Sequence, residues 1–269
     1  MKWIFKQSLL TLAAAVAAGS AQAHDPIFGI GPHVLFKQGV ETALELESSE
    51  AGDTQEQAFA FHGSYGITGD WAVGIELPYQ FVDENGNSES GNGDIALQTK
   101  YRFWRQDSLG LQESAAVLLK VVTDSSNSAL SKGATDSILG LTYGYEGRSW
   151  YRWASARYRF NGKNDAGVDR GDKILLDFVA GWRPKLTNYR QPDTVWLLEL
   201  NGELGQKAEF GGVDLSNTGG SEWFVSPGIF WTSRNFAIKA GVQLPLVQNL
   251  NGNQPGSDYR ARVSFEWHL

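Results

Sequence analysis

A two-residue alternation of apolar and polar side chains dominates this sequence from Val40 to its end. In one run, Trp71, Val73, Ile75 and Leu77 alternate with small or polar residues. A β-strand points successive side chains to opposite faces, so this period predicts strands with one apolar face and one polar face. Twelve segments follow the pattern, at residues 40–48, 55–68, 71–82, 94–105, 109–123, 136–146, 150–161, 172–184, 194–206, 221–232, 235–247 and 258–269.

The connections between these segments alternate in length. Short ones lie at residues 69–70, 106–108, 147–149, 185–193 and 233–234, and the connections between them are mostly longer and polar. Most segments reach the 9–11 residues that a tilted transmembrane strand needs. Short turns on one side and long loops on the other are typical of outer-membrane barrels. We therefore predict an all-β fold, a transmembrane antiparallel up-and-down β-barrel of about 12 strands.

The first residues have the order of a secretory signal. Lys2 and Lys6 precede an apolar run at Leu9–Ala18, and Ala21-Gln22-Ala23 provides a cleavage site. The apolar run is too short for the roughly 20 residues of a membrane-spanning helix, which argues against the alternative of a retained anchor. We predict a signal peptide at residues 1–23, a solvated periplasmic N-terminal segment at 24–39 and the barrel at 40–269.

The composition restricts the chemistry and the partners. The chain has no Cys, which excludes disulfides, thiolate metal sites and cysteine nucleophiles. Its formal net charge is −7 and it contains no basic run, so we expect no nucleic-acid partner. No cofactor-binding motif is present, and we expect no cofactor.

The carboxyl end resembles the terminal strand that outer-membrane barrels present to their assembly machinery. Its apolar row ends at the last residue, although that position is Leu269 where this signal usually has Phe: Tyr259, Ala261, Val263, Phe265, Trp267 and Leu269. We therefore expect the chain to lie in the cell outer membrane, with the lipid bilayer and the barrel-assembly machinery as partners.

The opening of the predicted mature chain, His24-Asp25-Pro26-Ile27-Phe28-Gly29-Ile30-Gly31-Pro32-His33, resembles that of a family of outer-membrane transporters. The strands beginning at Gly69-Asp70-Trp71 and Gly93-Asp94-Ile95 share the resemblance. The family is grouped with the channel proteins of phenol-degradation pathways, and some relatives are thought to accompany heavy-metal export. The resemblance implies a barrel that passes small molecules. Related long-chain fatty acid channels carry an N-terminal plug of several tens of residues, and from residues 24–39 we expect no such plug.

The inner wall of the predicted barrel carries charges of both signs. A barrel of this size has a narrow lumen, and charged side chains set which ions pass such a pathway. The same side chains would alternatively pair across the lumen and fill a closed, structural barrel. The candidates are Glu41, Glu45, Glu47, Glu76, Lys100, Arg102, Lys120, Arg157, Arg159, Lys173, Asp177, Glu199, Glu203, Lys239, Arg260, Arg262 and Glu266.

Histidines near the predicted mature N-terminus suggest a second function. Imidazole and carboxylate groups suit Zn²⁺ or Cu²⁺, so His24, Asp25 and His33 are candidate metal ligands, with His268 at the periplasmic end of the last strand as a further group. The spacing matches no established ligand motif. A metal-linked component of the outer membrane is therefore an alternative to a simple channel.

One residue pair admits an enzymatic alternative. His62 and Ser64 are two apart on one strand, as in the catalytic pair of outer-membrane phospholipases, where the histidine activates the hydroxyl. Here the alternation points both side chains into the lumen rather than to lipid, and the Asn that follows the nucleophile in those enzymes is missing. We expect no enzyme.

Overall fold

The computed structural model describes residues 25–126, 130–187 and 191–269. The predicted signal peptide and His24 lie outside these residues. The strands are β1 Val40–Ala51, β2 Thr54–Thr68, β3 Trp71–Glu84, β4 Asn87–Asn92, β5 Ala96–Ser108, β6 Leu111–Val122, β7 Asp136–Gly147, β8 Trp150–Phe160, β9 Val168–Asp169, β10 Lys173–Trp182, β11 Asp193–Gly205, β12 Glu209–Phe210, β13 Val213–Asp214, β14 Gly220–Ser233, β15 Phe236–Leu250 and β16 Tyr259–His268. No helix of the described residues has the length and apolar character to cross a membrane.

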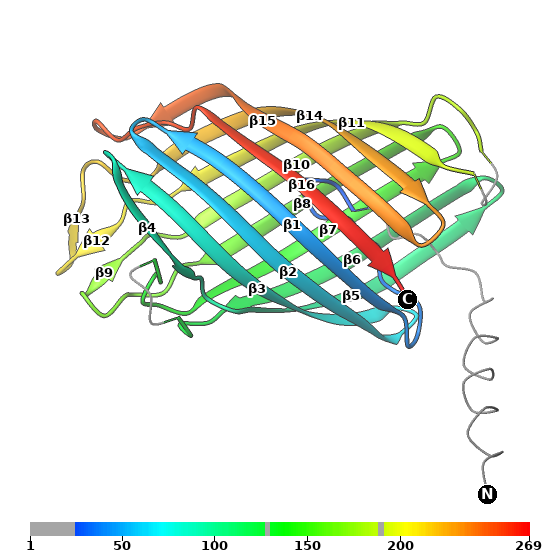
Figure 1. The fold of residues 1–269 in the computed structure, drawn as a ribbon, viewed down its shortest axis with the longest axis horizontal. Coiled ribbons are helices and arrows are strands. Elements are labelled where there is room, and N and C mark those ends of the chain that lie inside the picture. The colour runs from blue at the N-terminus through cyan, green and yellow to red at the C-terminus, as the bar shows by residue number, and fades with distance from the viewer. Residues whose placement is uncertain (1–24, 127–129, 188–190) are drawn as a thin grey trace, which may run out of the picture.

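Twelve long strands close into an antiparallel barrel, as the alternation predicts (Figure 1). Each strand pairs with the next long strand in sequence, β2 pairs with β3, and β16 returns to pair with β1. The chain therefore leaves no open edge among the long strands, so their backbone groups are satisfied within the wall. The predicted strand positions are confirmed to within a few residues at their ends.

The short strands β4, β9, β12 and β13 lie in three of the long connections, and the alternation does not predict them. β4 extends the wall by pairing with the end of β3, in a hairpin closed at Asn85-Gly86. Both hairpin residues have positive φ, which a two-residue turn of this kind requires. β9, β12 and β13 form a separate small sheet outside the barrel wall.

The outer face of the barrel is an apolar belt. Large apolar side chains on strands around the barrel contribute to this belt, and each has more than a third of its surface exposed. Among them are Leu44, Phe59, Phe61, Leu77, Leu97, Phe103, Leu119, Leu141, Phe178, Leu198 and Leu244. An apolar surface of this extent is rare on water-soluble monomers, and it marks contact with a membrane or a partner.

The main apolar core lies inside the barrel, where the segment before β1 packs against the wall. Ile27 is buried among Tyr151, Trp153, Val195 and Phe230, with Phe28 beside them. Our prediction of a solvated segment at 24–39 is therefore wrong for residues 25–35, all of which are buried or half-buried. We call residues 25–39 the N-terminal plug, because even this short segment enters the lumen and packs against the wall.

Candidate functional site

The N-terminal plug contacts several strands of the wall. At its start, Asp25 Oδ2 is 2.5 Å from Lys100 Nζ on β5. Further along, Thr142 Oγ1 on β7 donates to the Ile30 carbonyl oxygen at 2.9 Å. Burial raises the pKa of Asp25, but the positive charges of Lys100 and Lys239 outweigh burial and hold that pKa below its usual value. The plug is thus tied to the wall at several points by groups that are ionised or polar at neutral pH.

Glu199 on β11 forms the main polar anchor of the plug. Its Oε1 accepts a hydrogen bond from the Ile27 N–H at 2.7 Å, and its Oε2 accepts from Phe28 at 3.2 Å and Gly29 at 3.0 Å. The side chain is almost fully buried. A buried carboxylate is stable only when hydrogen-bonded, and three consecutive backbone N–H groups of the plug meet that need here.

A polar network behind Glu199 fixes the anchor to the neighbouring strands. Asn201 donates to Glu199 Oε2 at 3.3 Å and to Asp177 Oδ1 at 2.9 Å. Arg157 pairs with Asp177 at 2.8 Å and also reaches the Phe28 carbonyl oxygen. Arg262 Nη1 donates to the Ile27 carbonyl oxygen at 2.7 Å. Both sides of the plug backbone near Ile27 therefore have wall partners.

Small residues of the wall make room for the plug. A Cβ built on Gly228 would collide with Ile27 Cδ1, and one on Gly144 would come within 2.7 Å of Pro32 Cγ. At the end of the plug, the Gln38 N–H donates to the Gly66 carbonyl oxygen at 2.7 Å, and the Gly66 N–H donates back to Gly39 at 2.9 Å. A Cβ on Gly66 would overlap the Phe36 carbonyl oxygen, which is backbone and cannot rotate away.

We expect Gly66→Ala to displace the C-terminal end of the plug while leaving the barrel folded. Overpacking of this kind costs about 1–3 kcal/mol, and here the clash falls on the plug backbone. Limited proteolysis should cleave the variant faster at Lys37. Gly63→Ala on the same strand is the control, because its Cβ would meet Ile75 Cγ2 at an ordinary 3.6 Å. Equal cleavage of the two variants would contradict this account.

Two adjacent cavities of about 420 Å³ each lie in the lumen beside the plug. They share Phe28 of the plug and the wall residues Glu47, Arg157, Arg159 and Arg262. Other lining residues are Glu45, His62, Glu76 and Lys120 in one cavity and Lys173, Glu203 and Arg260 in the other. A solute in either cavity would therefore meet a polar, charged wall on several sides.

Most of the predicted lumen charges pair with one another. The ion pairs join Lys120 to Glu76 at 2.5 Å, Lys239 to Glu266 at 2.7 Å, Arg157 to Asp177 at 2.8 Å, Lys173 to Glu203 at 3.5 Å and Arg262 to Glu45 at 3.7 Å, with closer pairs at Arg260–Glu203 and Arg262–Glu47. Arg159 pairs with Asp136 at 2.6 Å and Glu41 with His268 at 3.1 Å. The paired charges agree with a closed, structural barrel, and the remaining cavities agree with a solute pathway. Each of the two interpretations of the sequence therefore describes part of the lumen.

Arg102 has a different place from the other candidates. It lies beside a register shift of β5, and its guanidinium binds Asp70 Oδ1 at 2.7 Å and the Gly69 carbonyl oxygen. These partners form the turn between β2 and β3. Arg102 therefore holds a turn at the end of the barrel, and it does not line the two lumen cavities.

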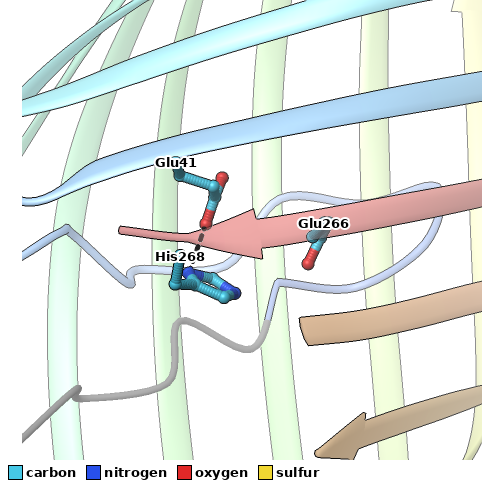
Figure 2. Close-up of side chains that lie close together, drawn as sticks. All are labelled: Glu41, Glu266 and His268. Carbon is cyan, nitrogen blue, oxygen red and sulfur yellow. Dashed lines mark ion pairs between the residues drawn. The ribbon is translucent and has the colours of Figure 1, made fainter. Parts of the chain in front are cut away.

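The predicted N-terminal metal ligands are held by other partners. Asp25 pairs with Lys100, and His33 pairs with Glu146 on β7. His24 lies outside the described residues. Within residues 25–126, 130–187 and 191–269, one group of three metal-capable side chains lies close together, and it consists of Glu41, Glu266 and His268 (Figure 2).

His62, the histidine of the enzymatic alternative, points into the lumen as the alternation predicts. Its ring nitrogens lie 3.7 Å from Glu45 Oε1 and 3.9 Å from Glu76 Oε2. Both neighbours are carboxylates of the cavity wall. His62 is therefore part of the charged lining of the lumen.

The residues that receive the plug are not among those predicted from the sequence. Tyr151, Trp153, Val179, Val195 and Leu197 are apolar side chains on the inner face, where the alternation calls for polar ones. The signal was present in the run Val195-Trp196-Leu197-Leu198, which is apolar on both faces. An apolar patch on the inner wall is unfavourable when water fills the lumen, and the plug buries this patch.

Comparison with known proteins agrees with the barrel. The fold is similar to that of an outer membrane channel from Pseudomonas putida F1, with a TM-score of 0.72 and 12% identity over 92% of this chain and 100% of that chain. It is also similar to the NanC porin, with a TM-score of 0.51 and 12% identity over 84% of this chain and 100% of that chain. At these identities the likeness is one of fold. No curated protein matches the sequence.

A family model matches residues 48–245, from within β1 to within β15. That span covers most of the chain and most of the barrel wall. It confirms the grouping that the opening residues and the Gly-containing strands indicate. The chain therefore belongs to the family described as "Putative MetA-pathway of phenol degradation".

Proposed function

We propose that this protein is an outer-membrane channel that lets small solutes or ions diffuse through its lumen when the N-terminal plug leaves its seat. The apolar belt supports a place in the lipid bilayer, because a closed barrel satisfies its backbone there. In this proposal the signal peptide is cleaved, and the last strand is read by the barrel-assembly machinery.

The proposal rests on the charged wall of the lumen, on its cavities and on the plug that crosses it. Its wall is polar and charged around two cavities of about 420 Å³ each, and the segment that crosses it is not a strand of the barrel. A segment outside the hydrogen-bonded wall can move without breaking the wall. Removal of the plug therefore opens the lumen while the barrel remains closed on itself.

Conductance in planar bilayers tests the proposal. The unchanged protein should conduct rarely, because each charged hydrogen bond that holds the plug in the lumen is worth about 1.5–3 kcal/mol. A variant lacking residues 25–36 has no plug and should conduct steadily. We expect at least about a tenfold increase in mean current, since about 1.4 kcal/mol changes a population tenfold.

Heat-modifiable migration on gels provides the control that the shortened barrel is folded. A folded variant that passes no current would reject the channel and support the closed, structural barrel instead. The solutes that reduce the current of the shortened variant by occupying its lumen would then indicate the class of cargo.

A further inference from the structure

Three metal-capable side chains meet where the first and last strands of the barrel pair (Figure 2). Glu41 on β1 lies opposite His268 on β16, and Glu266 precedes His268 by two residues. Residues two apart on a strand share a face, so all three side chains project into the lumen. One potential ligand atom from each lies within 4.8 Å of the others.

One carboxylate oxygen of this group lacks a partner. Glu266 Oε1 is 2.7 Å from Lys239 Nζ, but Glu266 Oε2 is buried and has no hydrogen-bond partner. The Glu266 side chain is 8% exposed, and so is that of His268. A buried carboxylate oxygen without a protein partner is costly, and a bound ion or an ordered water can supply the missing partner.

The charge around the group favours a cation. Asp25 and Lys100 line the same small cavity as Glu41, and Lys239 contacts Glu266. The three carboxylates of Asp25, Glu41 and Glu266 thus face the two ammonium groups of Lys100 and Lys239. Because an imidazole binds a metal in its neutral form, these carboxylates and ammonium groups leave one negative charge for a bound divalent ion to balance.

The donor set indicates which class of ion fits. One imidazole and two carboxylates suit Zn²⁺ and similar divalent transition metals, whose ligand bonds of about 2.0–2.2 Å place ligand atoms roughly 3–4 Å apart. Glu41 Oε2 and His268 Nδ1 are already 3.1 Å apart. Rotation of the glutamate side chains, which moves their carboxylate oxygens by about one ångström, brings the third ligand atom into range. Lys239 then acts as the group that orients the Glu266 carboxylate.

We propose that Glu41, Glu266 and His268 bind one divalent transition-metal ion, with Zn²⁺ as the best match. The site differs from the set formed by His24, Asp25 and His33, and it is independent of whether the barrel conducts. The ion would bridge β1 and β16 at the closure of the barrel. Three protein ligands leave one position of a tetrahedral ion for water or a solute.

Titration calorimetry of the folded, metal-stripped barrel with Zn²⁺ tests this proposal. We expect one ion per chain, and at least about a tenfold loss of affinity in both Glu266→Gln and His268→Gln, since even the groups that support metal ligands are worth 10–100-fold. Glu89→Gln is the matched control, because Glu89 lies on the exposed hairpin strand β4. Its affinity for Zn²⁺ should equal that of the unchanged protein.

A second variant separates the two metal sites. Combined replacement of His24 and His33 by Ala should leave the binding of one Zn²⁺ intact. Loss of binding in that variant, with retention in Glu266→Gln, would overturn the proposal in favour of the N-terminal ligands. Absence of binding by the unchanged, folded protein at 100-fold molar excess of Zn²⁺ would also overturn it. Heat-modifiable migration verifies that each variant is folded.

Discussion

We expect Glu199→Gln to raise the fraction of time that the channel conducts by about 30-fold. The glutamine has the size of glutamate, but its amide nitrogen donates where an oxygen now accepts. It therefore directs a donor at the backbone N–H groups of Ile27, Phe28 or Gly29. The variant loses one charged hydrogen bond and places two N–H donors against each other, which together cost about 2 kcal/mol. A change of that size in the equilibrium between bound and released plug corresponds to the expected 30-fold increase.

Two measurements check this expectation. Single-channel recording gives the open fraction, and hydrogen exchange at the amides of residues 27–29 reports release of the plug directly. Glu203→Gln is a matched control, because it removes the same charge from the same strand and face, where Glu203 pairs with Arg260 and Lys173. Exchange at residues 27–29 should be unchanged in the control. Unchanged exchange in Glu199→Gln would show that this carboxylate does not hold the plug.

The barrel was predictable because its cause is local. The alternation along one strand, such as Trp71, Val73, Ile75 and Leu77, decides which face contacts lipid and which faces the lumen. The lengths of the connections then decide how the strands are ordered. Neither step requires knowledge of contacts between distant residues, so the twelve long strands and the inward direction of the charges follow from the sequence.

The plug was not predictable because its contacts are distant. Ile27 and Glu199 are 172 residues apart in the sequence, and nothing about either residue type predicts that the two are in contact. The metal-capable group illustrates the same limit, because Glu41 meets His268 only through closure of the barrel. From the sequence we grouped His268 with His24, Asp25 and His33. The pairing of β1 with β16 places Glu41 beside His268, and Glu266 lies two residues before it on the same strand.

Asp136→Asn should lower the free energy of unfolding by about 2–3 kcal/mol. Asp136 is fully buried at the start of β7 and accepts from Arg159 at 2.6 Å, from Arg170 and from the Gly162 N–H at 3.0 Å. Removing one partner of a buried pair costs about 3–5 kcal/mol because the other charges stay unpaired. The two guanidinium groups are about one quarter exposed, so water recovers part of that cost.

Urea unfolding of the detergent-solubilised barrel measures this loss, and trypsin reports its location. Asp136 holds Arg170 and Gly162, which flank the connection between β8 and β10, so the variant should be cut faster after Arg170. Asp107→Asn is the control, because the pair of Asp107 with Arg105 is largely exposed and such pairs contribute less than about 1 kcal/mol. If both variants unfold at the same urea concentration, the buried carboxylate does not stabilise this end of the barrel. If only Asp136→Asn is weakened and is cut after Arg170, one side chain joins the start of β7 to the connection that follows β8.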